Sequence, residues 1–214
     1  MGQIDFGDIL ISLVVLLFSL SIHESAHAWT ADHFGDFTGR YLGRVSLNPL
    51  VHIDPVGTVL FPLIAVLTHI PLIGWAKPVP VNAANLKDPK KDQIFIAAAG
   101  PAINLVVAAF CFVLVHLLQS FFDGQVQQPH PVLTPLFQLF FVGMFINVFL
   151  AVFNLIPIPP LDGSWILYGL LPPELSDVYD QIRPYGFLLL MVLLYTGALG
   201  FIWSPLVSFL NSIL

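Results

Sequence analysis

The sequence predicts an all-α integral membrane protein, a bundle of four to five transmembrane helices with a re-entrant segment. The first observation is composition: 57% of the 214 residues are hydrophobic and 9% are charged, whereas soluble domains carry about 25% charged residues. The second is that several apolar runs are long enough to cross a bilayer, which takes about 20 residues. No polar stretch is long enough to fold alone, so we expect residues 1–214 to form a single membrane-embedded domain.

The apolar runs define the expected spans. They lie near 9–30, 56–73, 93–119, 133–156 and 185–211. We expect the run at 56–73 to be re-entrant, with a full span as the alternative, because Pro62 and Pro71 suit an irregular path that is buried in protein. If the run at 56–73 is re-entrant and the other four runs cross the membrane, all seven Lys and Arg residues lie on one side of the membrane. The positive-inside rule makes this the cytoplasmic side.

The segment 42–59 raises two further expectations. Apolar residues alternate near turn residues around Tyr41 to Leu47, which predicts a short membrane-associated β element. His52 and Asp54 follow, and they would contact a metal site only if they folded back onto a span. The alternative for Asp54 is a turn-stabilising role before Pro55.

The first apolar run ends in His23-Glu24-Ser25-Ala26-His27. On a helix, His23 and His27 lie one turn apart on one face and can bind one Zn²⁺, while Glu24 can act as general base on the metal's water. An ionisable residue at the bilayer centre costs about 2.5–3.5 kcal/mol on insertion scales, so a function for this group is the default hypothesis.

Zinc needs a third protein ligand, and His33 is the first candidate. It stands ten residues after His23, which is the third-ligand spacing of metzincin proteases. A continuous helix would carry it about 15 Å along the axis from His23. Metzincins turn the chain with a glycine at a position that Thr30 occupies here, so His33 is the weaker candidate.

Asp162 is the second candidate. It follows Pro157, Pro159 and Pro160, which cannot continue a helix and force an extended, rigid segment. Gly163 allows a tight turn directly after the carboxylate. Such a segment could return Asp162 to the membrane as a zinc ligand, and an ordinary loop aspartate is the alternative.

These two motifs together resemble the site-2 protease family of intramembrane zinc metalloproteases. In that family a His-Glu-x-x-His span is joined by an Asp from a Leu-Asp-Gly motif, here Leu161-Asp162-Gly163. The resemblance implies that His23, His27 and Asp162 bind one Zn²⁺ per chain and that Glu24 is the base.

Two asparagines also match the family's motifs. Asn154 opens Asn-Leu-Ile-Pro-Ile-Pro-Pro-Leu-Asp-Gly, and Asn104 closes Ala-Gly-Pro-Ala-Ile-Asn. The resemblance suggests that either amide holds the substrate backbone or stabilises an oxyanion. An interhelical hydrogen bond within the bundle is the alternative for each.

Other elements resemble a minimal prokaryotic subgroup that lacks a PDZ module and a C-terminal regulatory domain. They are Gly35-Asp36, Gly43 to Pro49, His52 to Thr58 and Gly74 to Asn82. The resemblance implies a protein of the prokaryotic cytoplasmic membrane, and the sidedness of the basic residues predicts that the active site lies toward the cytoplasm.

The expected function is regulated intramembrane proteolysis, in which peptide bonds within or near transmembrane segments of membrane proteins are hydrolysed. The expected partners are a transmembrane protein substrate and the lipid bilayer; the net charge of −6 argues against nucleic acid, and no pattern indicates an oligomeric state. Two alternatives are a zinc-dependent hydrolase of lipid amides or esters and a non-catalytic metal-binding membrane protein. Function that survives Glu24→Gln would favour the last.

Overall fold

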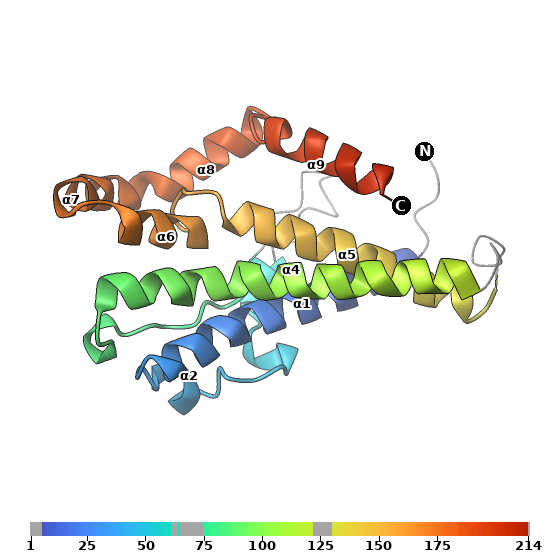
Figure 1. Cartoon of the computed structure of the whole chain (residues 1–214), viewed down its shortest axis with the longest axis horizontal. Coiled ribbons are helices and arrows are strands. Elements are labelled where there is room, and N and C mark those ends of the chain that lie inside the picture. Colours follow the sequence, from blue (N-terminus) through green and yellow to red (C-terminus); the bar gives the residue numbers. More distant parts are fainter. Residues whose placement is uncertain (1–5, 61–63, 65–74, 122–129, 214) are drawn as a thin grey trace.

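The computed structural model describes residues 6–60, 64, 75–121 and 130–213, and the regular elements in this part of the chain are all helical. Three long helices run side by side along the molecule: α1 (Phe6–His33), α4 (Pro89–Phe121) and α5 (Leu133–Asn154) (Figure 1). Each packs against the other two. All three are long and apolar enough to cross a membrane. The predicted all-α membrane fold is therefore confirmed, and helices of spanning length lie where spans are predicted at 9–30, 93–119 and 133–156.

The ends of α1 and α4 are set by local sequence. Gly35 adopts a positive φ of 103° and lets the Asp36 N–H bond back to the Ala31 carbonyl at 2.9 Å, which terminates α1. At the start of α4, the Asp88 carboxylate accepts the Lys91 N–H and the Asp92 carboxylate accepts the Asp88 N–H, and Pro89 occupies a position that needs no donor. Figure 1 shows α1 ending and α4 beginning at the same end of the bundle.

The last apolar run differs from the straight span expected at 185–211. After α6 (Asp162–Leu170) and α7 (Pro173–Ile182) come η5 (Arg183–Tyr185), α8 (Gly186–Tyr195) and α9 (Gly200–Ser212). The segments Pro173–Tyr195 and Gly200–Ser212 together could form a fourth span, but they meet at 61°. The break occurs because Gly197 takes a positive φ of 71°.

The β element expected around 42–59 is not formed. After α2 (Thr38–Tyr41), this segment contains the 3₁₀ turn η1 (Pro49–Val51) and the π-helical η2 (Pro55–Leu60). The physical reason is capping by side chains: Asn48 accepts the Leu50 N–H at 3.1 Å, and Asp54 caps η2. Most of the predicted re-entrant run at 56–73 lies outside the described residues.

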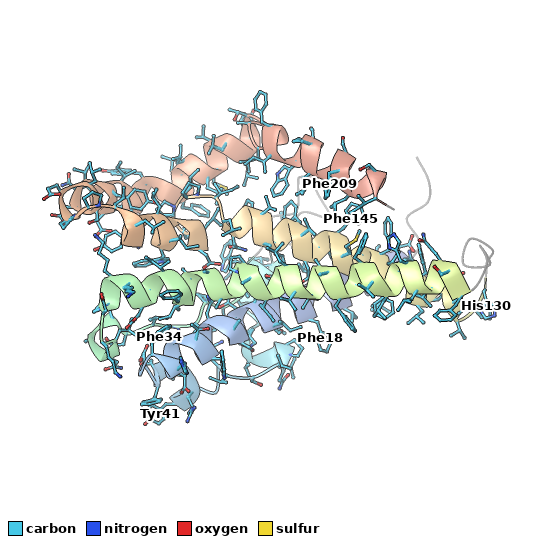
Figure 2. The ribbon with its side chains drawn as sticks, viewed as in Figure 1. Phe18, Phe34, Tyr41, His130, Phe145 and Phe209 are labelled. Carbon is cyan, nitrogen blue, oxygen red and sulfur yellow. The ribbon has the colours of Figure 1, made fainter. Side chains whose placement is uncertain are left out.

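The outside of the bundle is apolar, as expected in lipid. Figure 2 shows the side chains along the helices, including Phe18 on α1 and Phe209 on α9, both more than half exposed. Inside the bundle, polar residues lie among buried apolar ones such as Ile96 and Met144. Asn104 and Asn147 are almost completely buried there. This distribution of apolar side chains outside and polar groups inside is typical of a membrane-embedded site.

Asp36 ties the end of α1 to the segment that precedes α4. Its fully buried carboxylate accepts hydrogen bonds from Thr38, from the Asn82 N–H at 2.7 Å and from the Asn85 amide at 2.8 Å. Burial alone would raise the pKa of Asp36, but these hydrogen bonds outweigh it and hold the pKa below its usual value. The ionised form of Asp36 therefore stabilises this end of the bundle.

Candidate metal centre

Three side chains from two helices converge inside the bundle. His23 and His27 lie on one face of α1, and Asp162 is the first residue of α6. The Oδ2 atom of Asp162 lies 3.1 Å from His23 Nε2 and 3.3 Å from His27 Nε2, and the two Nε2 atoms are 3.1 Å apart. These three residues are the one group in the described part of the chain with metal-ligand geometry.

Each imidazole is hydrogen bonded through its Nδ1 atom, and these bonds leave Nε2 as the ring nitrogen that faces Asp162. His23 Nδ1 lies 2.5 Å from Asn104 Oδ1, and His27 Nδ1 lies 2.7 Å from the Ile96 carbonyl oxygen. Both of these oxygens can only accept, so each Nδ1 carries the proton and each Nε2 presents a lone pair. Asp162 Oδ2 is also an acceptor and has no hydrogen-bond donor among the described residues. Three buried acceptors that face one another in this way suit a cation between them.

The spacing fits zinc. Tetrahedral Zn²⁺ with ligand bonds of about 2.0–2.1 Å places its ligand atoms about 3.3 Å apart, close to the observed 3.1 to 3.3 Å. Two imidazoles and one carboxylate also leave the fourth position for water, as in catalytic zinc sites.

Two glycines make room for the ligands. A Cβ on Gly100 of α4 would lie 2.6 Å from His23 Nε2 and closer still to His27 Nε2. A Cβ on Gly163 would overlap the Leu155 carbonyl, which lies just past the end of α5. Gly100 thus lets α4 pack directly on the ligand atoms, and Gly163 lets α6 start close to α5 with Asp162 turned toward α1.

A chain of buried polar groups supports His23. Asn104 accepts from His23, and its own amide donates to Asn147 Oδ1 at 2.7 Å. Asn147 in turn donates to Ser19 Oγ at 2.8 Å and to the Gly143 carbonyl at 2.8 Å. The Asn104 side chain therefore forms interhelical hydrogen bonds and orients the His23 imidazole. The site predicted from the sequence does not include Asn147, although a lone amide within an apolar run is a recognisable signal.

A backbone hydrogen bond holds the Glu24 carboxylate in place. Its Oε2 accepts the Val79 N–H at 3.0 Å, from an extended segment after Trp75. No sequence signal identified this contact, because any residue other than proline supplies the same N–H. The half-buried carboxylate is thus fixed next to the two histidine ligands.

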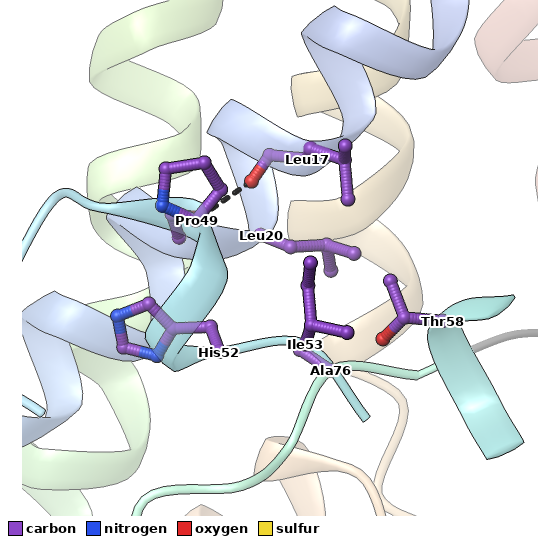
Figure 3. Close-up of a pocket in the computed structure, with 8 residues that line it drawn as sticks. Leu17, Leu20, Pro49, His52, Ile53, Thr58 and Ala76 are labelled. Atoms are coloured by element: carbon purple, nitrogen blue, oxygen red, sulfur yellow. Dashed lines mark hydrogen bonds between the residues drawn. The ribbon is translucent and has the colours of Figure 1, made fainter. Parts of the chain in front are cut away.

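The loop that supports this segment folds back onto α1. His52 is buried and bonds the Ser46 carbonyl at 2.8 Å, while Ser25, beside Glu24, bonds the same carbonyl. Figure 3 shows the surrounding pocket, where Pro49, His52, Ile53 and Thr58 meet Leu17 and Leu20 of α1. His52 therefore reaches the span without joining the ligand group, and Asp54 caps η2 through Val56 and Gly57.

Two other predicted candidates lie elsewhere. His33, at the end of α1, stacks on Trp29 with 6.1 Å between ring centroids and does not belong to the ligand group. Asn154, at the end of α5, donates to the Leu150 carbonyl at 2.9 Å, and its second amide N–H has no partner among the described residues.

Comparison with known proteins agrees with this geometry. The family model described as Peptidase family M50 matches residues 11–194. The chain belongs to peptidase family M50. It is thus a metalloprotease of the site-2 protease family, as the motifs suggested.

Relatives carry matching names. The chain is 36% identical over 196 residues to a Bacillus subtilis (strain 168) protein named "Putative zinc metalloprotease YwhC", covering 92% of this chain and 85% of that protein. It is 34% identical over 189 residues to "Putative zinc metalloprotease Rip2" of Mycolicibacterium smegmatis, covering 86% of this chain and 66% of the relative. No solved structure matches the chain.

Proposed function

We propose that the chain is an intramembrane protease that uses one Zn²⁺, held by His23, His27 and Asp162, to hydrolyse peptide bonds within or near transmembrane segments of membrane proteins. One observation supports the proposal. The acceptor atoms of His23, His27 and Asp162 lie 3.1 to 3.3 Å apart where α6 meets the long helix α1, with no donor to Asp162 Oδ2 among the described residues. A bound Zn²⁺ would act as a Lewis acid and lower the pKa of a water in its open position.

The chain's own residues supply the proton transfer, the positioning and the oxyanion donor. Glu24 accepts the proton of the attacking water and returns it to the leaving amine. The Val79 N–H keeps the carboxylate in one orientation, and Asn104 keeps His23 in the tautomer that presents Nε2. We propose the free N–H of Asn154 as a donor to the developing oxyanion.

The fold supports a cytoplasmic orientation of the site. The described basic residues lie in and just after α2, in the segment that leads to α4, at the start of α4 and in η5. Figure 1 shows α2, the start of α4 and α7 at one end of the bundle. By the positive-inside rule this end faces the cytoplasm of a prokaryotic cell. A substrate helix must partly unwind to reach the site, because a helical span satisfies all of its own backbone groups.

The proposal is tested by reconstituting the purified protein with model single-span peptides in liposomes and analysing the products by mass spectrometry. Wild type should cleave one bond in or near the span. Glu24→Gln should abolish cleavage while keeping zinc, because it removes the base and leaves the three ligands in place. A Glu24→Gln variant that cleaves as fast as wild type would overturn the assignment of the base, and wild type that cleaves no peptide would overturn the proposed function.

A further inference from the structure

Beside the metal centre lies a cavity of about 360 Å³. Three elements form its wall: the extended segment before α4, the first turns of α4, and α6. Its lining includes Val79, Val81, Lys90, Gln93, Trp165 and Tyr168. Two sides of the cavity connect to the proposed machinery, because the Val79 N–H holds Glu24 and Trp165 stands one helical turn after Asp162.

One side of the cavity is an extended backbone, which we name the 77–82 segment. Its ends are anchored by the bonds of the Lys77 N–H to the His52 carbonyl at 2.8 Å and of the Asn82 N–H to Asp36 at 2.7 Å. Pro78 and Pro80 keep it extended. The carbonyls of residues 78–80 have no hydrogen-bond partner among the described residues. An extended backbone with unpaired carbonyls is a surface on which a peptide can pair as a strand.

Another part of the cavity lining carries a positive charge. Lys90 is the one charged residue in the cavity lining. Its ammonium donates to the Leu171 carbonyl at 2.6 Å and to Ser176 Oγ at 2.9 Å, and it lies 5.5 Å from the centre of the Tyr168 ring. These partners are neutral, and no carboxylate in the described part of the chain forms an ion pair with Lys90. An ammonium has three donors, so one remains for a ligand.

We propose that this cavity is a substrate subsite for an acidic side chain, which meets Lys90 while the substrate backbone lies along the 77–82 segment. This inference rests on the proposed proteolytic function. Charge complementarity favours the acid, and Trp165 and Tyr168 provide apolar walls for its methylene groups.

The geometry also sets where the acid must stand in the substrate. The ligand atoms pack against Gly100, and Lys90 and Gln93 precede it by about 15 and 10 Å along α4 at about 1.5 Å per residue. An extended peptide advances about 3.3 Å per residue. The acidic residue should therefore lie about three to five residues from the cleaved bond, near the membrane surface where α4 begins.

The test uses a model single-span peptide whose cleaved bond has been mapped in liposomes. Each of the five residues on either side is replaced in turn by Glu, Gln and Lys, and kcat/KM is measured. Wild type should prefer Glu over Lys by about tenfold or more at one position, three to five residues from the bond. Lys90→Glu should reverse this preference, and Gln93→Glu should abolish it without touching the bonds of Lys90. Lys91→Glu is the matched control, because Lys91 is exposed and does not line the cavity.

The outcomes separate the inference from the function on which it rests. If wild type cleaves the Gln peptides but shows no charge preference, or if the preference survives both Lys90→Glu and Gln93→Glu, the subsite is refuted and the protease stands. If Lys90→Glu fails to fold, as judged by elution in detergent and zinc content, Gln93→Glu decides. If wild type cleaves none of the peptides, the proposed function falls and the subsite falls with it.

Discussion

Replacing Gly100 with alanine should destroy the metal centre while leaving the fold intact. The new Cβ would lie 2.6 Å from His23 Nε2 and closer still to His27 Nε2. An ordinary contact needs about 3.5 Å, so the ligand atoms must retreat by about 0.9 Å. Zinc sites tolerate deviations of about 0.2 Å in ligand distance. We therefore expect zinc affinity to fall by about 100-fold or more, or about 2.8 kcal/mol.

The assay for Gly100→Ala is zinc titration against a competing chelator, with circular dichroism and detergent elution as checks of folding. Alanine is the better helix former by about 1 kcal/mol, so helix propensity alone would act in the opposite direction. Gly200→Ala is the matched control, since its Cβ would meet nothing within 4 Å. A folded Gly100→Ala protein that binds zinc within about threefold of wild type would refute the packing of α4 on the ligands.

Three further predictions test the surroundings of the site. Asn104→Ala should lower zinc affinity by about 10–100-fold, because His23 loses the acceptor that fixes its tautomer; chelator competition measures this, and unchanged affinity would contradict it. Val79→Pro removes the N–H that holds Glu24, so kcat on a model peptide should fall by about tenfold, roughly the value of one such bond, with zinc content unchanged; loss of zinc would point to a disrupted fold instead. Because the pKa of Asp36 is lowered in the fold, its stabilising effect is present above the pKa of the unfolded chain and is lost as the pH falls through the folded pKa. Thermal unfolding should therefore show wild type losing more stability below about pH 4 than Asp36→Asn, and equal slopes would contradict this.

Much of the geometry of the candidate metal centre could be predicted because its information is local. The spacing of His23 and His27 places both on one helical face in any α-helix, and Asp162 stands in a short motif whose prolines and glycine constrain the backbone. The three long spans were equally clear, because length and hydropathy decide them.

The remainder depends on contacts between distant parts of the chain. Asn147 supports the site through Asn104, and nothing in their sequence separation encodes that bond. The alternation near 42–59 predicts a strand, but the short side chains of Asn48 and Asp54 bond their own neighbouring backbone and select turns. At 185–211 the hydropathy predicts one straight span, while Gly197 breaks the helix.

The most direct test of the metal centre is the number of zinc ions per chain in protein purified in detergent. Wild type and His33→Ala should each hold about one zinc, because His33 stands apart from the ligand group. Asp162→Ala should lose it, because one of the three converging acceptors is gone. Zinc retained in Asp162→Ala but lost in His33→Ala would contradict the ligand assignment.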